Sequence, residues 1–210
     1  MPDRPGPHTD DVRREVERLA ALGNRRLLTG ALHHGELGPF LAAGFVEHER
    51  LHLLRHDLRT LPEDTSGTRV RRAWRRDQPA VLTIDEAAFD RFWALDRRGL
   101  EDAVRATPSA RFRVSTDAEG VVTGYAVTGR AAERGYLQRL AVDPARHRAG
   151  VGRALVADGL RWLRRSGTSV AVVNTQEGND AALALYLATG FVPEPRGLTV
   201  LVLDLAPPDA

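Results

Sequence analysis

A strand, a glycine-containing loop and a helix follow one another in residues 140–155, and this order constrains the fold more than any other stretch. Leu140 to Val142 has the apolar character of a strand end, and Val151 to Arg165 has apolar residues at helical spacing. Gly150 and Gly152 stand at the start of this helix. Because glycine lacks a β-carbon, successive backbone N–H groups can face one point there, where the helix adds a partial positive charge. The stretch predicts an α/β fold with a pyrophosphate cradle, although the glycines by themselves fit an ordinary loop equally well.

Two ordered motifs carry a family resemblance. The first reads His147-Arg148-Ala149-Gly150-Val151-Gly152, and the second runs from Asn174 through Asn179 and Tyr186 to Gly190-Phe191. They resemble the acetyl-CoA-binding signature Arg/Gln-x-x-Gly-x-Gly/Ala and the second signature of the GNAT superfamily of N-acyltransferases. The departure is His147, which stands where the family has arginine or glutamine. The backbone cradle does not depend on that side chain, and the resemblance covers roughly residues 69–206.

The resemblance implies an acyl-CoA-dependent N-acetyltransferase. Its mixed central sheet would be flanked by helices, with the fourth and fifth strands splayed apart to admit acetyl-CoA. The pantetheine arm would pair with the backbone of Leu140 to Val142, where an N–H would polarise the thioester carbonyl. The acetyl group would pass directly to a primary amine in a ternary complex, and Arg148 or Arg153 could supply charge to the phosphates. The expected cofactor-binding residues are Leu140, Ala141, Val142, His147, Arg148, Ala149, Gly150, Val151, Gly152, Arg153, Asn174 and Asn179.

Tyr186 matches the family tyrosine that donates a proton to the leaving thiolate; a core aromatic on a helix face is the other interpretation. An amine nucleophile must also lose a proton. Strand alternation places Tyr136 and Gln138 on one face with Leu140, and neither is a carboxylate. Glu133 is a candidate base, although a solvated turn residue is favoured there, and a chain of waters ending at a carbonyl would also serve. The sequence does not identify the general base.

The rest of the sequence predicts strands and helices in a mixed α/β order. Asp77 is expected to cap the first helix of the acetyltransferase domain. Strands are expected at 70–74, 111–115, 121–128, 136–142, 169–173 and 198–205, and helices at 78–88, 100–106, 151–165 and 181–188.

Residues from about 11 to 58 look like a degenerate copy of residues 155–205. Gly44-Phe45-Val46 matches Gly190-Phe191-Val192, and Phe40 falls opposite Tyr186. We therefore expect a degenerate half-GNAT module at 1–60, a linker at 61–68 and the acetyltransferase domain at 69–206. The copy lacks a two-glycine cradle and the tyrosine hydroxyl, so it is expected to be catalytically silent.

Composition narrows the possible classes of protein further. The chain has no run of about 18 apolar residues and no apolar stretch near Met1, so neither a membrane span, a membrane partner nor a signal peptide is expected. Cysteine is absent, which excludes a thiol nucleophile and favours a cytoplasmic location. All 30 basic residues are arginine, but 28 acidic residues leave a net charge of only +2, a weak indication of a polyanionic partner.

Two rival functions compete with this interpretation. His48-Glu49-Arg50-Leu51-His52 matches the HExxH pattern of zinc hydrolases, but the repeat predicts a strand there and no third ligand is evident, so no metal is expected. Arginines between Arg69 and Arg76, with Trp74 among them, could form a nucleic-acid patch, and the solvated side of a strand is favoured instead. A non-catalytic CoA- or nucleic-acid-binding module is the alternative class.

The sequence allows two classes of acceptor, a small-molecule amine and a peptide N-terminus. Phe89, Phe92 and Trp93 lie at the connection between two predicted helices, which in the GNAT superfamily lines the acceptor side. They could form an apolar wall there or pack in the core. A homodimer is also left open.

Overall fold

The computed structural model describes residues 6–63 and 66–205. Residues 64–65 of the predicted linker and residue 206 of the predicted domain lie outside the described residues. The chain divides into two compact units. The terminal unit combines residues 1–53, 174–180 and 193–210, and the central unit combines residues 54–173 and 181–192.

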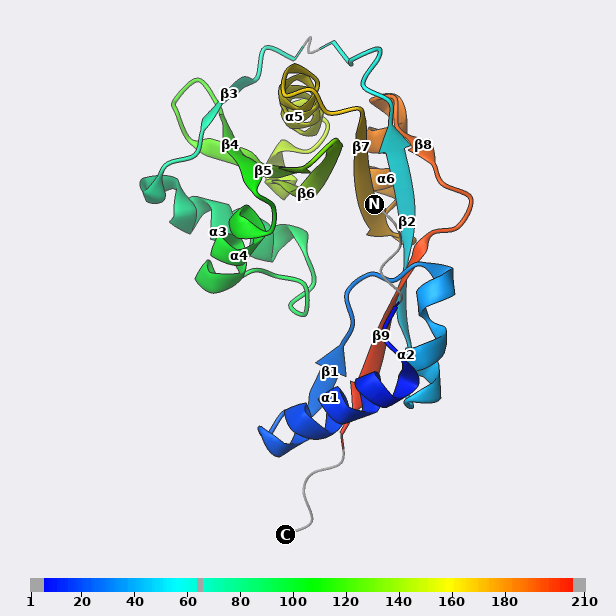
Figure 1. Ribbon diagram of the computed structural model, residues 1–210. Helices are drawn as coiled ribbons and strands as arrows, with labels where there is room; N and C mark the ends of the chain where they lie inside the picture. The colour runs from blue at the N-terminus through cyan, green and yellow to red at the C-terminus, as the bar shows by residue number, and fades with distance from the viewer. Residues whose placement is uncertain (1–5, 64–65, 206–210) are drawn as a thin grey trace. The chain divides into compact units, whose positions relative to one another are not determined.

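The central unit is built on a mixed sheet (Figure 1). Its order is β3-β4-β5-β6-β7, with antiparallel pairs from β3 to β6 and a parallel pair between β6 and β7. The strands are β3 (Arg69–Arg72), β4 (Ser109–Thr116), β5 (Val122–Ala131), β6 (Arg134–Val142) and β7 (Val170–Gln176), whose last residues belong to the terminal unit.

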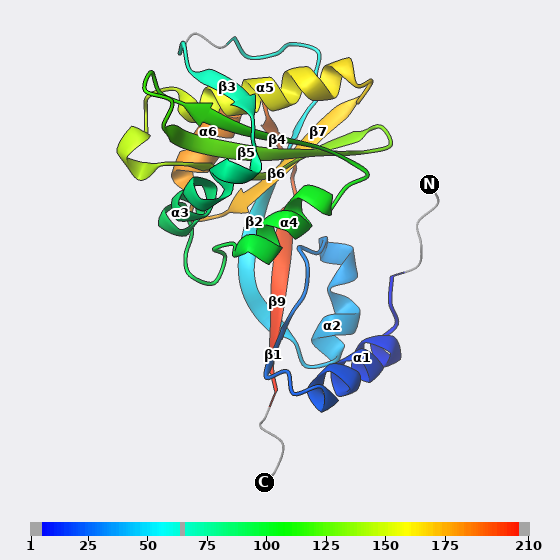
Figure 2. The same cartoon turned by 90° about the vertical axis from the view of Figure 1, so that its left-hand side faces the viewer.

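Helices cover both faces of this sheet. Figure 2 shows α5 (Val151–Arg165) above the strands, with α3 (Gln78–Ala88) and α4 (Arg97–Arg105) below them. The lower layer buries Val81, Ile84, Leu100, Val114, Tyr125 and Val127. The upper layer packs α5 and α6 (Asp180–Ala188) into a second core around Leu137, Leu160, Leu163, Tyr186 and Phe191. The predicted α/β fold with a mixed sheet flanked by helices is confirmed.

Local sequence sets most element bounds. The expected helices 78–88 and 151–165 are the observed α3 and α5. Asp77 is the N-cap residue of α3, as expected, but its side chain makes no hydrogen bond to that helix. Its carboxylate instead accepts from the Trp74 backbone N–H at 2.7 Å and from the Arg71 guanidinium at 2.7 and 2.9 Å. A short 3-10 helix precedes α3, and the carboxylate holds that turn.

Strand β6 contains a bulge that simple alternation does not predict. Its register to β5 shifts between Leu137, opposite Thr128, and Arg139, opposite Val127, which leaves Gln138 as the extra residue. Arg139 therefore lies on the α3–α4 face, whereas Leu140 packs on the α5 face with Val151 and Leu155. The expectation that Tyr136 and Leu140 share one face was wrong for this reason.

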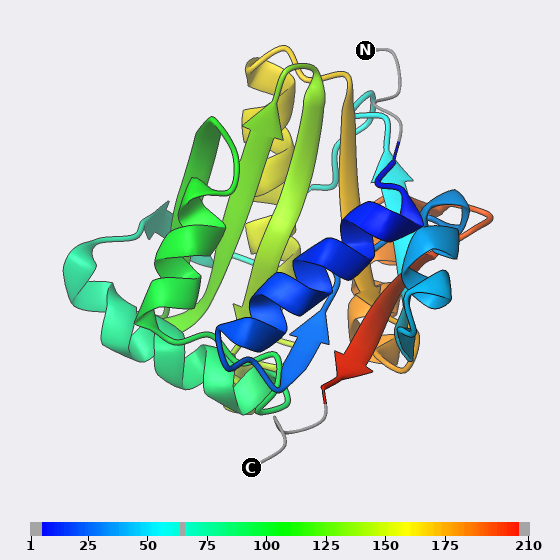
Figure 3. The ribbon, with the colours of Figure 1, turned by 60° about the horizontal axis from the view of Figure 1, so that its bottom comes forward.

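The terminal unit has its own small sheet and core. Strand β9 (Leu198–Asp204) lies between β1 (Arg26–Leu28) and β2 (Val46–His56) and is antiparallel to both. Helices α1 (Thr9–Ala21) and α2 (Gly38–Ala42) and the core of Val12, Leu27, Phe45 and Leu201 complete the unit. Figure 3 shows α1 running in front of β1. A short 3-10 helix (His34–Glu36) and β8 (Val192–Pro193) are the remaining small elements.

The two predicted copies share a turn geometry. In the first, the Phe45 N–H bonds to the Phe40 carbonyl at 3.1 Å, Gly44 has φ +96° and the two rings meet edge-on at 5.6 Å. In the second, the Phe191 N–H bonds to the Tyr186 carbonyl at 3.0 Å, Gly190 has φ +93° and the rings are again 5.6 Å apart. The local pattern is the same, and its interpretation as a half-domain stays a prediction.

The HExxH segment lies within strand β2, and a strand lacks the helical spacing that would bring its two histidines to one face. Across residues 6–63 and 66–205, no three His, Cys, Asp or Glu side chains gather as metal ligands. Among the described helices, none is long and apolar enough to cross a bilayer.

Candidate active site

The loop between β6 and α5 has the backbone geometry of an anion cradle. Asp143 accepts from the Ala145 N–H at 2.9 Å and starts a 3-10 turn over Pro144–Arg146. Arg148 and Gly150 then adopt left-handed conformations, with φ of +61° and +82°. Left-handed residues alternating with others turn successive N–H groups toward one point. Since this conformation is uncommon for arginine, Arg148 marks a position where the surrounding loop dictates the backbone.

The first turn of α5 adds donors to this loop. The N–H groups of Val151, Gly152 and Arg153 have no acceptor within the helix, because α5 begins at Val151. The same end of α5 carries its positive partial charge. Loop and helix together can hold a pyrophosphate through backbone donors.

Both glycines also have packing reasons to lack a side chain. A β-carbon on Gly150 would lie 2.5 Å from the Ser66 β-carbon, and one on Gly152 would lie 3.0 Å from a Leu185 methyl. Substitution of either glycine would therefore disturb packing as well as any bound phosphate. Variants at Arg148, which is exposed, separate these effects better.

The side chains of this motif point to different partners. His147 Nε2 lies 3.3 Å from the Val142 carbonyl oxygen. The Arg153 guanidinium donates to the backbone oxygens of Glu63 at 3.0 Å and Ala188 at 3.1 Å. Ala149 is exposed and Val151 is buried in the core. Of the two arginines expected near the phosphates, Arg153 is thus held by carbonyls and Arg148 faces solvent.

Strand β6 has one edge that leaves its neighbour. The parallel ladder between β6 and β7 ends at Tyr136 opposite Val172. From Leu137 onward β6 is paired only with β5 among the described strands, and Leu140 to Val142 continue that ladder. The backbone of these three residues therefore has one edge with no strand bonded to it, which is the splay that the sequence predicted between the fourth and fifth strands of the family fold.

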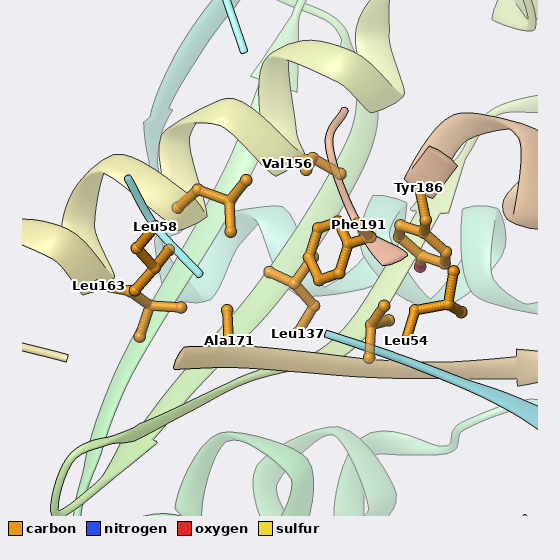
Figure 4. Close-up of a cluster of buried hydrophobic side chains, with 10 residues drawn as sticks. Leu54, Leu58, Leu137, Val156, Leu163, Ala171, Tyr186 and Phe191 are labelled. Atoms are coloured by element: carbon orange, nitrogen blue, oxygen red, sulfur yellow. The ribbon is translucent and has the colours of Figure 1, made fainter. Parts of the chain in front are cut away.

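Tyr186 lies in the second core of the central unit. Figure 4 shows its ring beside Phe191 and Leu54. Only 6% of the residue is exposed, and burial raises the pKa of its hydroxyl to about 12. Across residues 6–63 and 66–205 no group hydrogen-bonds to this hydroxyl. The ring packs as a core aromatic, and the hydroxyl keeps its proton at neutral pH.

The two asparagines of the second motif belong to the terminal unit. Asn174 is exposed in β7, and the Asn179 N–H bonds to the Gln176 carbonyl at 2.9 Å just before α6. The loop from 147 to 153 belongs to the central unit. Glu133 is an exposed turn residue, and its carbonyl accepts from the Ser169 N–H at 3.0 Å.

Sequence reasoning missed a buried ionic network on the α3–α4 face. Arg139 makes two hydrogen bonds of 2.8 Å to Asp85, whose residue is 0% exposed, and Tyr125 donates its hydroxyl to the same carboxylate. Burial and this hydrogen bond raise the pKa of Tyr125. The available signal was an acid on the apolar face of a helix and an arginine inside an apolar strand.

Comparisons with known proteins agree with this architecture. The family model described as Acetyltransferase (GNAT) family matches residues 68–191. A mycothiol acetyltransferase of Thermobispora bispora is 30% identical over 177 residues, which cover 75% of this chain and 60% of that protein. A [ribosomal protein bS18]-alanine N-acetyltransferase of Escherichia coli is 28% identical over 116 residues, covering 55% of this chain and 74% of that one.

A solved structure shares the fold. The tandem GNAT protein from the clavulanic acid biosynthesis pathway superposes with a TM-score of 0.71 at 16% identity, over 95% of this chain and 70% of that one. The chain spans less than two thirds of the mycothiol acetyltransferase it matches. The family match covers more than half of the chain and includes the cradle, the splayed strand and Tyr186. The chain belongs to the GNAT acetyltransferase family.

Proposed function

We propose that this chain is an acetyl-CoA-dependent N-acetyltransferase that acts on a primary amine in a ternary complex. The observation that carries the proposal is the adjacency of two features at the end of β6. A strand edge with no ladder partner among the described strands runs from Leu137 to Val142, and a loop with left-handed Arg148 and Gly150 follows it directly. An extended chain ending in a pyrophosphate has the complementary shape and charge.

Each part of the site has its own function in this reaction. The N–H groups of Arg148 and of residues 150–153 bind the pyrophosphate, and the free edge at Leu140 to Val142 pairs with the amide groups of pantetheine. A backbone N–H of that edge stabilises the negative charge that develops on the thioester oxygen. Because the chain contains no cysteine, no acyl-cysteine is formed, and the amine attacks the carbonyl carbon directly.

The reaction forms a C–N bond and breaks the C–S bond. The leaving thiolate takes a proton from the Tyr186 hydroxyl, which is protonated at neutral pH because burial raises its pKa. The amine loses its proton to water, since Glu133 is an exposed turn residue rather than a group held in the site. Tyr186 regains a proton from solvent after the products leave.

The acceptor belongs to one of two chemical classes. The relatives are named for mycothiol and for an alanine of a ribosomal protein. A small-molecule amine and a peptide N-terminus are therefore both supported as acceptors. A panel containing both classes distinguishes them, with release of free thiol as the readout.

Calorimetric titration with acetyl-CoA tests the proposal first. We expect binding in the micromolar range, on the order of −7 to −8 kcal/mol. Thiol release that depends on an added amine then shows transfer. Binding without amine-dependent release would identify a non-catalytic CoA-binding module, and no binding at all would remove the proposal.

A further inference from the structure

Two arginines of β4 share one carboxylate under α5. Strand β4 alternates: Phe112 and Val114 pack in the α3–α4 core, so the arginines before and between them face α5. Arg111 makes two hydrogen bonds of 2.8 and 3.0 Å to Asp158 of α5. Arg113 Nε lies 3.8 Å from the same carboxylate, too far for a hydrogen bond. Asp158 is thus engaged by Arg111, and Arg113 receives only a weak contact.

Strand β3 brings a third arginine to the same place. Arg72 is directly opposite Arg113 in the antiparallel ladder of β3 and β4, so the two side chains lie on one face. Val70, on that face of β3, packs with Val151 and Leu155 under α5. Figure 2 shows both strands beneath this helix. Like charges that lie directly opposite each other repel, and an anion between them would remove the repulsion.

The charge of this group is unbalanced. We call Arg72, Arg111, Arg113 and Asp158 the arginine cluster; three positive charges against one negative charge leave a net charge of +2. Three of the side chains are largely withdrawn from water, with exposed fractions of 23% for Arg111, 20% for Arg113 and 17% for Asp158. In the described part of the chain Arg113 makes one hydrogen bond, to the Phe112 carbonyl at 3.2 Å. Charges removed from water need partners, because burial takes away the water that would solvate them.

The helix above the arginine cluster is basic as well. Helical spacing puts Arg161 and Arg165 on the same stripe of α5 as Asp158, so the next positions along that stripe add positive charge. Burial, the largest cause, lowers the pKa of Arg113, and the neighbouring charge of Arg111 adds to this effect. The cluster is therefore a place where a positive charge is held in the fold at a cost that an anion would offset.

We propose that the arginine cluster binds the phosphate group of a small molecule between Arg72 and Arg113. A phosphate monoester carries a charge of about −1.5 to −2 at neutral pH, which balances the net charge of the cluster. Its oxygens accept hydrogen bonds from the guanidinium groups, whose planar forks fit a phosphate. A carboxylate fits the same forks but supplies less charge. This binding is independent of the proposed acetyl transfer.

The arginine cluster is separate from the proposed pyrophosphate cradle. Asp158 lies about two turns beyond Val151, the first residue of α5, which is about 10 Å at a rise of 1.5 Å per residue. The donors of the cluster are side chains of β3 and β4, whereas the cradle uses backbone N–H groups of the loop before α5. The pyrophosphate of CoA and a second phosphate-bearing molecule can therefore bind at the same time.

Methyl phosphate and dimethyl phosphate are the matched probes, since they differ by one methyl group and one negative charge. Binding is followed by tryptophan fluorescence, because the Arg72 guanidinium carbon lies 5.5 Å from the centre of the exposed Trp74 ring. Titrations are made with and without an excess of acetyl-CoA, which fills the proposed cradle. Arg72→Gln and Arg113→Gln each remove one guanidinium group from the site. Arg69→Gln is the control, because it removes an exposed arginine from the opposite face of β3.

We expect methyl phosphate to bind about tenfold more tightly than dimethyl phosphate, with and without acetyl-CoA. Arg72→Gln and Arg113→Gln should each weaken its binding about tenfold or more, and Arg69→Gln should leave it within about twofold of the parent value. Methyl phosphate should raise the melting temperature of the parent protein and of Arg69→Gln, but not that of Arg113→Gln. Without phosphate, Arg113→Gln should be at least as stable as the parent protein, since it loses a charge that lacks a full partner.

Three results would overturn the proposal. The first is equal affinity for the two probes, or affinity for methyl phosphate that neither Arg72→Gln nor Arg113→Gln lowers. The second is displacement of methyl phosphate by acetyl-CoA but not by dephospho-CoA, which would assign the cluster to a phosphate of CoA itself. The third is binding of short single-stranded DNA, lost in Arg72→Gln, without any binding of methyl phosphate. A parent protein that binds methyl phosphate but not acetyl-CoA would contradict the proposed function and support this site.

Discussion

At the scale of single residues, Tyr186 occupies a packing position, and we propose a chemical role for its hydroxyl. Its ring meets Phe191 edge-on and fills a core shared by α5 and α6, while its hydroxyl has no hydrogen-bond partner in the described part of the chain. Burial raises its pKa to about 12, so the hydroxyl keeps its proton at neutral pH and can serve as the proposed donor to the thiolate. The ring and the hydroxyl can therefore be separated by mutation.

Tyr186→Phe should lower kcat by roughly 10²-fold or more, the usual scale for one proton-transfer group. The affinity for acetyl-CoA and the melting temperature should change little, because the ring stays and no bond to the hydroxyl is lost. The measurement is single-turnover thiol release, with Tyr136→Phe as a control on β6. Equal turnover of Tyr186→Phe and the parent protein would show that Tyr186 contributes only to packing.

Arg148 tests the cradle without disturbing the glycine contacts. Arg148→Gly keeps the left-handed backbone and its N–H, whereas Arg148→Pro removes the N–H and fixes a negative φ. Both variants lose the same charge, so only the backbone differs. Acetyl-CoA should bind about tenfold more weakly to the proline variant than to the glycine variant, a difference of about 1.4 kcal/mol in calorimetry. Equal affinities would show that the loop backbone does not hold the phosphates.

Residue motifs were the most predictable part of this chain, and side-chain partners the least. The order of the two motifs pointed to the cradle and to Tyr186. It did not point to the bonds of Arg153 with the Glu63 and Ala188 carbonyls, since both carbonyls come from distant parts of the chain. The Asp85–Arg139 pair was missed for the same reason.

At the scale of elements, periodicity predicted α3 and α5 well because each has one apolar face against the sheet. It failed at β6, where the bulge at Gln138 reverses the faces of the residues that follow. A bulge adds one residue to a strand without altering its composition. The alternation of apolar and polar residues in the sequence therefore does not reveal it. The face of Arg139, and with it the pair that Arg139 forms with Asp85, could only be seen in the folded chain.

The end of β2 provides a prediction on pH. His56 is 2% exposed and accepts from the Leu58 N–H at 2.9 Å; burial, the largest cause, lowers its pKa below the usual 6.5. The unfolded chain therefore binds a proton more readily than the native one. The free energy of unfolding should be greatest above about pH 6.5 and fall as the pH is lowered below it.

Urea unfolding at about pH 7.5 and about pH 5.5 measures this loss. In His56→Gln the loss between the two pH values should be smaller than in the parent protein, even though the variant is less stable at both. If the parent protein and the variant lose equal free energy between these values, His56 does not carry the effect.

At the scale of the whole molecule, the chain passes repeatedly between its two units. Residues 174–180 and 193–205 return to the terminal unit after the central sheet has been built. Strand β9 pairs with β1 and β2, so its partners come from the start of the chain. The alternation of the sequence predicted β9 as a strand but not its pairing with β1 and β2. A strand pattern does not specify the strands with which it will pair. The predicted domain limits therefore stay predictions.

A variant beginning at Ser66 should lose solubility. It lacks β1 and β2, which leaves both edges of β9 unpaired and exposes Leu201, now 1% exposed. Weak acetyl-transfer by any soluble fraction would agree with a docking function for residues 6–56. A soluble fragment as stable as the full chain, with altered acceptor KM, would favour a regulatory lid instead.

The silent-copy hypothesis predicts the stoichiometry of acetyl-CoA. The first copy has Phe40 where the second has Tyr186, so it lacks the hydroxyl that the proposed mechanism uses. Calorimetric titration of the full chain should therefore give one molecule of acetyl-CoA per chain. Two sites of comparable affinity would overturn the hypothesis.

The pairing of β9 also sets an order for biosynthesis. Arg26 to Leu28 find their partners only at Val202 to Asp204, so β1 and the early helix α1 emerge from the ribosome long before the strand that covers them exists. Contacts of such sequence separation slow folding. The edge of β1 that pairs with β9 therefore stays without that partner until residues 198–204 have been synthesised.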